Sequence, residues 1–202
     1  MWTADSPYGP FSKLTWTTPG SNPAPVFHKG AFYMTNQHTM QVWTTPRLGG
    51  NWTTYAEISY ASLPANWIVE DPFLWVDKRG SFHIVNHAYD NYQYENCGNS
   101  TVSAHFFSAD GKDWHNLGVQ PYGHTIHYDD GTSHTYTTLE RPNLHFDSSG
   151  QLTHINLAAD LVTGDEGCAN RTKHSHFGHC PCDNCKWADH AGTVIIALDL
   201  NM

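Results

Sequence analysis

Short runs of alternating apolar and polar residues, separated by glycine turns, recur along this chain. Three of them start with two polar residues and a proline and end at a glycine: Ser21–Gly30, Glu70–Gly80 and Glu140–Gly150. A second alternating run follows each glycine: Ala31–Thr35, Ser81–Val85 and Gln151–Leu157. Alternation with a period of two predicts half-buried strands. Repetition of such a unit is typical of propellers and solenoids.

A second repeat joins the later strands of each unit. A strand ending in Thr or Ser is followed by a Pro/Gly turn and an aromatic residue that opens another strand, in Met1–Phe11, Val42–Trp52 and Phe106–Trp114. This layout predicts a hairpin between the third and fourth strands of a unit. The predicted fold class is therefore all-β, a propeller whose blades have four antiparallel strands with the proline-containing strand innermost.

The repeats divide the chain into parts of one predicted propeller domain. Residues 1–16 supply the outer half of a blade, 21–60 and 70–119 one blade each, and 140–200 a blade with a Cys/His-rich insert at 165–190. This is a little over three blades, whereas closed propellers typically have about 4–8. We therefore expect either a segment upstream of Met1 or pairing of the open ends with another chain. Because Met1 falls inside a repeat, the upstream segment is favoured.

The composition fits strands and argues against two classes of partner. Only 14% of the 202 residues are charged, and the 8 Trp, 10 Tyr and 9 Phe are residue types that pack well on a pleated sheet. With 10 Lys+Arg and a formal net charge of -9, the chain is not expected to offer the basic face that binds nucleic acid. No apolar run approaches the roughly 20 residues that a membrane-spanning helix needs.

Two features indicate an oxidising, extracellular compartment. Asn-X-Ser/Thr glycosylation sequons begin at Asn51, Asn99 and Asn170. Most of the cysteines lie close together in the insert, at Cys168, Cys180, Cys182 and Cys185. The first residues lack the basic and apolar stretches of a signal peptide. We therefore expect a secreted glycoprotein whose leader is not part of this chain.

The clustered cysteines permit two interpretations. Zinc binding would need four N or S ligands, which the cysteines and neighbouring histidines could supply, but Cys-x-Cys-x-x-Cys is not a standard zinc spacing. Two disulfides among the four cysteines are favoured in a chain that carries sequons. Their connectivity does not follow from the sequence. Cys97 is then left over, either free, paired with sequence outside this chain, or linking two chains.

The order of the short motifs resembles a known family. Ser6–Phe11, Ser21–Ala24, Glu70–Trp75 and Glu140–Pro142, with Thr153-His154 downstream, look like the five-bladed β-propellers of glycoside hydrolase family 43. The resemblance covers roughly residues 1–160 and implies an active site at the axial end of the propeller funnel. One fold hosts many functions, so the motifs are more specific for the fold than for the activity.

The resemblance implies three converging carboxylates: a general base, a general acid, and an aspartate that tunes the acid. Glu140 matches the acid and Asp71 the tuning aspartate, whereas the base belongs to a blade that would precede Met1. Asn22, the alternative in this chain, is an amide and a poor base. Inversion needs the acid and base about 6.5–9.5 Å apart. Asp71 would raise the pKa of Glu140 by like-charge repulsion, and Arg141 would lower it if it pointed into the same pocket. Alternatively, acidic residues before proline simply cap strand turns.

Further substrate-binding candidates lie on the second blade. His83, Val85 and His87 share one face of a predicted strand. The two histidines could contact sugar hydroxyls or an axial metal, or they could fill the funnel wall. Trp75 and Trp67 could stack on a sugar ring, or they could pack between blades, which is the more frequent fate of such residues.

Three functions stay open at this point. The first is an extracellular protein that hydrolyses glycosidic bonds like an inverting glycoside hydrolase. The second is a non-catalytic relative that binds glycan through the same funnel. The third is a structural glycoprotein that self-assembles through open blade edges, since unpaired edges are templates for pairing. No cofactor and no metal are expected, apart from a structural ion considered for the central channel.

Overall fold

The computed structural model describes residues 2–6, 8–13, 18–37, 41–59, 63, 67–90, 103–136, 139–160 and 191–197. The strands in this part of the chain are β1 (Trp2–Thr3), β2 (Ser12–Lys13), β3 (Ala24–His28), β4 (Ala31–Thr35), β5 (Gln41–Thr45), β6 (Thr53–Glu57), β7 (Trp67–Val76), β8 (Phe82–Asp90), β9 (Ser103–Ser108), β10 (His115–Asn116), β11 (Thr125–His127), β12 (Ser133–Thr135), β13 (Leu139–Phe146), β14 (Leu152–Asp160) and β15 (Ala191–Ala197). No helix within these ranges is long and apolar enough to span a membrane.

Several sequence-based predictions fall outside the described residues. These are the sequons at Asn99 and Asn170, all five cysteines (Cys97, Cys168, Cys180, Cys182 and Cys185), and the insert at 165–190. Asn51 is described and is exposed just before β6, a position that suits a glycan attachment site.

The strands pair antiparallel throughout the described sheets. Two four-stranded sheets have the orders β3-β4-β5-β6 and β7-β8-β9-β10, a three-stranded sheet has the order β13-β14-β15, and β1–β2 and β11–β12 form separate two-stranded pairs. The four-stranded sheets match the unit that the repeats predict, with the proline-containing strand at one edge. The pairs β1–β2, β5–β6 and β9–β10 confirm the hairpins predicted from the second repeat. The β11–β12 hairpin was not predicted.

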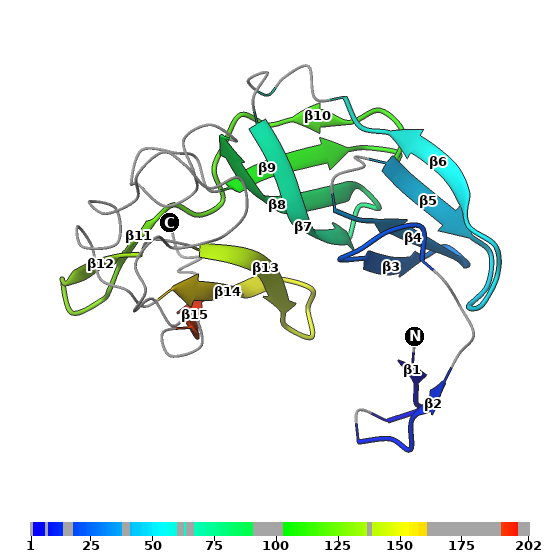
Figure 1. Ribbon diagram of the computed structural model, residues 1–202, viewed down its shortest axis with the longest axis horizontal. Coiled ribbons are helices and arrows are strands. Elements are labelled where there is room, and N and C mark those ends of the chain that lie inside the picture. Colours follow the sequence, from blue (N-terminus) through cyan, green and yellow to red (C-terminus); the bar gives the residue numbers. More distant parts are fainter. Residues whose placement is uncertain are drawn as a thin grey trace, which may run out of the picture.

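The proline-containing strands lie next to one another and hold the three larger sheets together. β7 contacts β3 on one side and β13 on the other, and the sheets fan out from these inner strands (Figure 1). Because side chains alternate along β8, the middle sheet is buried on both faces. Ile84 belongs to the core shared with the first sheet, and Val85 to the core shared with the third.

The two apolar cores therefore lie between successive sheets. The first consists of Val42, Ile58, Val69, Leu74, Phe82, Ile84, Ala88, Ala104, Phe106 and Trp114. The second consists of Val85, Tyr122, Ile126, Tyr136, Leu139, Leu144, Ile155, Leu157 and Ala159, so that the β11–β12 hairpin also packs into it.

The turns after the inner strands set the register of each sheet. Lys29 and Gly30 have φ of 45° and 82° and join β3 to β4 in the manner of a type I′ hairpin turn. After β7 and β13, Asp77 and Asp147 each accept a hydrogen bond from the backbone N–H four residues on, at 2.9 Å and 2.8 Å. Aspartate side chains favour such turns because they satisfy backbone donors locally.

Candidate active site

A β-bulge interrupts two of the inner strands, β7 and β13, at their prolines. On β7 the pairing with β8 shifts between Glu70 and Phe73, and β13 shows a shift at the corresponding place. Proline has no N–H to donate, so within sheets it is confined to edges and bulges. Pro72 and Pro142 therefore place the same irregularity in two neighbouring strands.

The residue before each proline has a left-handed backbone conformation. The φ angle is 45° at Asn22, 47° at Asp71 and 54° at Arg141. Such angles are uncommon for residues other than glycine, and they concentrate at functional sites. Consecutive strand residues normally point to opposite faces. At the β7 bulge, however, the carboxylates of Glu70 and Asp71 belong to one group of side chains.

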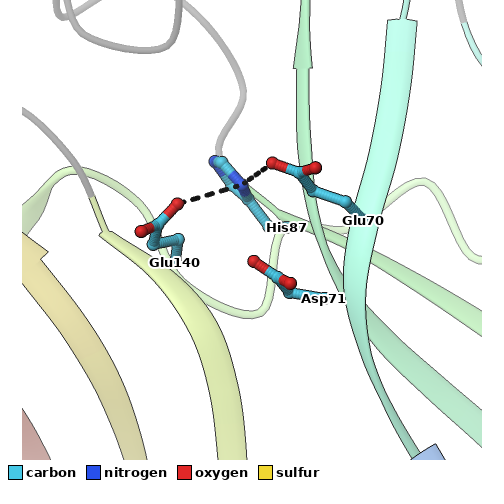
Figure 2. A group of neighbouring side chains, drawn as sticks. All are labelled: Glu70, Asp71, His87 and Glu140. Carbon is cyan, nitrogen blue, oxygen red and sulfur yellow. Dashed lines mark ion pairs between the residues drawn. The ribbon is translucent and has the colours of Figure 1, made fainter. Parts of the chain in front are cut away.

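This group consists of Glu70 and Asp71 on β7, His87 on β8 and Glu140 on β13. One potential ligand atom from each residue lies within 4.8 Å of those of the others. His87 Nδ1 lies 3.5 Å from Glu70 Oε1 and 4.0 Å from Glu140 Oε2 (Figure 2). The side chain of His87 is fully buried, whereas 26% of the Glu140 side chain is exposed. Glu140 is therefore the member of this pair that a ligand can reach from solvent.

Polar side chains from two inner segments border the group. Arg141 Nε lies 3.5 Å from Asp71 Oδ2 and 3.9 Å from Glu140 Oε1. The Asn22 amide donates a hydrogen bond to Asp71. An open pocket of about 340 Å³ lies at this end of the strands and is lined by Asn22, Pro23, Asp71, Pro72, Arg141, Pro142 and Asn143. The predicted residues Asn22, Asp71 and Arg141 therefore share one pocket, with Glu140 beside it.

Burial raises the pKa of Glu140 above its ordinary value. The charges of His87 and Arg141 act in the opposite direction, and those of Asp71 and Glu70 add to the increase. The largest cause is thus burial rather than the repulsion by Asp71 expected from the sequence. Arg141 opposes the shift, as expected for a side chain that points into the same pocket.

Glu70 was not among the site residues predicted from the sequence. Alternation along a regular strand would place it on the opposite face from Asp71, and the bulge reverses that expectation. Its position is reinforced by the Gln37 amide, which donates a hydrogen bond to the Glu70 carboxylate. The Glu-Asp-Pro motif, in which proline marks a bulge, is the signal that could have revealed it.

Tyr122 and His124 also lie near the site without a signal in the repeats. Tyr122 is only 5% exposed, and its pKa is raised well above the ordinary value by burial and by the charges of Asp71 and Glu140. His124 is 7% exposed and its pKa is lowered, mainly by burial and further by His87. Both residues belong to the segment before β11, between two repeats, where no pattern predicted a contribution.

The remaining candidates lie elsewhere on the middle sheet. His83 shares the face of His87 and Val85, since β8 pairs with β9 without a register shift. It contacts His105 and Asp77 rather than the carboxylate group. Trp75 stacks on His83 and packs against the second core, and Trp67 packs against the first. Neither His83 nor these tryptophans are among the residues that line the pocket.

The carboxylate group has the donor chemistry of a cation site. Three carboxylates and one imidazole could hold a divalent ion, and hard cations such as Ca²⁺ prefer carboxylate oxygen. Arg141 already provides a positive charge within 4 Å of two of these carboxylates. Arg141 therefore offsets part of the negative charge that a bound cation would otherwise offset.

The fold is similar to those of solved family-43 glycoside hydrolases. A thermostable family-43 glycoside hydrolase matches with a TM-score of 0.51 and 16% identity, over 74% of this chain and 46% of that one. The family-43 YxiA protein of Bacillus licheniformis has a TM-score of 0.43 and 17% identity, over 72% of this chain and 36% of that one. An exo-1,5-alpha-L-arabinanase from a bovine ruminal metagenomic library has a TM-score of 0.42 and 14% identity, over 68% and 48%.

The first of these comparisons confirms the resemblance at the level of the fold. The chain has an all-β, antiparallel architecture like part of a family-43 propeller, and it spans half or less of the length of these structures. No protein-family model matches the chain, and no curated protein matches it.

Proposed function

We propose that this chain is part of a carbohydrate-active propeller that hydrolyses glycosidic bonds with inversion, with Glu140 as general acid. The observation that carries the proposal is the meeting of Glu140 and Asp71, from two different sheets, beside an open pocket. The raised pKa of Glu140 supports it, because a general acid must hold its proton near the working pH. The similarity of the fold to glycoside hydrolases supports a carbohydrate as the substrate.

In this mechanism Glu140 gives its proton to the oxygen of the leaving sugar. Burial and, to a smaller extent, the Asp71 carboxylate raise the pKa of Glu140 and so favour the protonated form before the reaction. After proton transfer, Arg141 stabilises the new Glu140 carboxylate, since its Nε lies 3.9 Å from Glu140 Oε1. The Asn22 amide holds Asp71 in place.

The general base must come from another part of the propeller. Inversion needs a water between base and substrate, and so a separation of about 6.5–9.5 Å between the two carboxyl groups. One carboxylate oxygen of Glu70 and one of Asp71 lie within 4.8 Å of a carboxylate oxygen of Glu140. Both residues are therefore too close to Glu140 to serve as the base. We therefore assign the base to a blade beyond the strands described here, in a five-bladed ring of which this chain supplies a little over three blades.

Glu140→Gln tests the assignment of the acid. The variant keeps the shape of the side chain and loses the proton, so hydrolysis of a panel of aryl pentosides, aryl hexosides and polysaccharides should fall by about 10²–10⁴-fold. Glu57→Gln, at an exposed position on β6, is the matched control and should leave the rate unchanged. NMR that identifies which anomer of the product forms first tests whether hydrolysis proceeds with inversion. Unchanged turnover by Glu140→Gln in a folded protein would remove Glu140 as the acid.

Glycan binding without hydrolysis is the second candidate. The observation that favours it is Asn22, an amide that lies beside Asp71 in the pocket and cannot act as a base at neutral pH. If no substrate in the panel is hydrolysed, calorimetric titration with the same glycans distinguishes the two functions. Binding that is weakened by Asp71→Asn or Arg141→Ala, without turnover by the wild type, would establish the binding function.

The proposal includes an extracellular location. It is supported by the sequons at Asn51, Asn99 and Asn170 and by the cysteine-rich insert. Intact mass measured before and after glycosidase treatment, and alkylation before and after reduction, test glycosylation and disulfides separately. Light scattering of the native protein tests the alternative of self-assembly, which predicts a mass above that of one chain.

A further inference from the structure

A second cluster of polar side chains lies on the middle sheet, away from the carboxylate group. It consists of His83 on β8, His105 on β9, Trp75 on β7 and Asp77 just after β7. His83 and His87 are four residues apart on β8, which corresponds to about 13 Å along a strand. The cluster is therefore separate from the pocket beside Glu140.

The two histidines face each other through ring nitrogens. His83 Nδ1 lies 3.1 Å from His105 Nε2, and the two rings are inclined by only 27°. The Trp75 indole stacks over both, with centroids 4.7 Å from His83 and 5.5 Å from His105. The edge of Phe107 contacts the His83 ring. Aromatic walls therefore hold the two imidazoles nearly parallel, with Nδ1 of His83 next to Nε2 of His105.

Asp77 selects which nitrogen of His83 carries the proton. Its Oδ2 lies 3.4 Å from His83 Nε2. Although burial acts to raise the pKa of Asp77, hydrogen bonds from Arg79, Ser81 and His83 hold it well below its ordinary value, so the carboxylate is ionised. A carboxylate accepts a hydrogen bond only from a protonated nitrogen, so His83 Nε2 bears the hydrogen and Nδ1 keeps a lone pair. Metal-binding histidines are commonly oriented by a carboxylate in this way.

The nitrogen spacing suits two ligands of one metal ion. Zinc–imidazole bonds are about 2.0–2.1 Å long. Two such nitrogens lie about 2.9 Å apart at a right angle and about 3.4 Å apart at the tetrahedral angle, as follows from the same bond length. The observed 3.1 Å falls between these values. Burial lowers the pKa of both histidines, that of His105 to about 4, so both rings are neutral and able to ligate at neutral pH.

We infer that His83 Nδ1 and His105 Nε2 bind one divalent transition-metal ion, with Asp77 orienting His83 and water completing the coordination. Binding requires only that the His105 proton reside on Nδ1 instead of Nε2, so no electron is transferred. Among first-row divalent ions, Cu²⁺ should bind most tightly to such a nitrogen pair. The inference does not depend on the proposed hydrolytic function.

Copper titration of the full chain tests this site, because an ion between the histidines lies under the Trp75 indole and should quench its fluorescence. The wild type should show a quenching phase of one Cu²⁺ per chain that His105→Gln and Trp75→Phe lack. Asp77→Asn should weaken it by about 10–100-fold, as expected for loss of an orienting carboxylate. His154→Gln, at an exposed histidine of the third sheet, is the matched control and should keep the phase. The same phase in His105→Gln would overturn the proposal and leave the histidine pair as packing alone.

A measurement on the wild type keeps the test valid if a variant fails to fold. Zn²⁺ added to protein labelled with ¹⁵N-histidine should shift the resonances of His83 Nδ1 and His105 Nε2. Comparison of these metal-dependent shifts between the wild type and His105→Gln also separates this site from the cysteines and histidines of residues 165–190, because the variant retains those residues. The site would be ruled out if neither Zn²⁺ nor Cu²⁺ changed the ring-nitrogen resonances of His83 and His105.

Discussion

Phe106 has the largest fully buried side chain among the described residues, and its removal should cost a large part of the protein's stability. It lies on β9 at 0% exposure, in the core shared by the two four-stranded sheets. Replacement of a buried Phe by Ala loses the transfer free energy of the ring and leaves a cavity, which together cost about 3–5 kcal/mol. A domain is stable by only about 5–15 kcal/mol, so Phe106→Ala should remove about a fifth of the stability or more.

Phe27→Ala is the matched control. Phe27 also lies on a strand of a four-stranded sheet, but it is 60% exposed and its ring contacts that of Phe32. Full burial of a Phe contributes about 1.5–3 kcal/mol, so the buried two fifths of Phe27 should contribute roughly 1 kcal/mol. The difference between the two variants should therefore be about 2–4 kcal/mol.

Urea unfolding followed by tryptophan fluorescence and circular dichroism measures both losses, provided that the slopes of the transitions match. If Phe106→Ala does not fold, Phe106→Leu, a smaller truncation, should show a smaller loss of the same sign. Equal destabilisation by Phe106→Ala and Phe27→Ala would refute the assignment of Phe106 to the core.

Three further predictions concern the pocket and the turns. The raised pKa of Glu140 means that the stability contributed by its protonated form is full below the ordinary pKa and is lost as pH rises through the raised one. Glu140→Gln should therefore gain stability relative to wild type as pH rises from the ordinary pKa through the raised one; a pH-independent difference in urea unfolding would contradict this. Gly30 and Gly111 have φ of 82° and 80°, so Gly30→Ala should lower the free energy of unfolding by about 1–2 kcal/mol. Gly111→Ala should lower it by about 1–3 kcal/mol more, because the new methyl group would meet an aromatic ring at 3.1 Å. Equal melting temperatures of the two variants would contradict this crowding. Asn22→Asp replaces the donor to Asp71 by a second carboxylate, so it should be less stable than the wild type at pH 7; equal stability of the two proteins in urea unfolding would show that the two side chains do not interact.

Much of the fold could be predicted because the signals are local. Alternation marks the strands, and turn residues such as Gly30 and Asp77 mark where each strand reverses. The prolines at 72 and 142 make Asp71 equivalent to Arg141, and Glu70 equivalent to Glu140. The repeat therefore placed these polar pairs at one end of the inner strands, whereas the meeting of Asp71 with Glu140 was implied by the resemblance to family 43. The β11–β12 hairpin is short and outside the repeats, and therefore carried no comparable signal.

The sequence by itself thus determined the strands of the repeats and their pairing within each sheet, because these depend on period, turn chemistry and repetition. The pairing of Asp71 with Glu140 came from the resemblance to a known family. The tertiary structure alone decided the composition of the site. The bulge turned Glu70 to the side of Asp71, and the contact between sheets buried Glu140, made burial the main cause of its raised pKa, and brought Tyr122 close to it. Side-chain direction at a bulge and desolvation between sheets depend on three-dimensional contacts, which no spacing along the chain encodes.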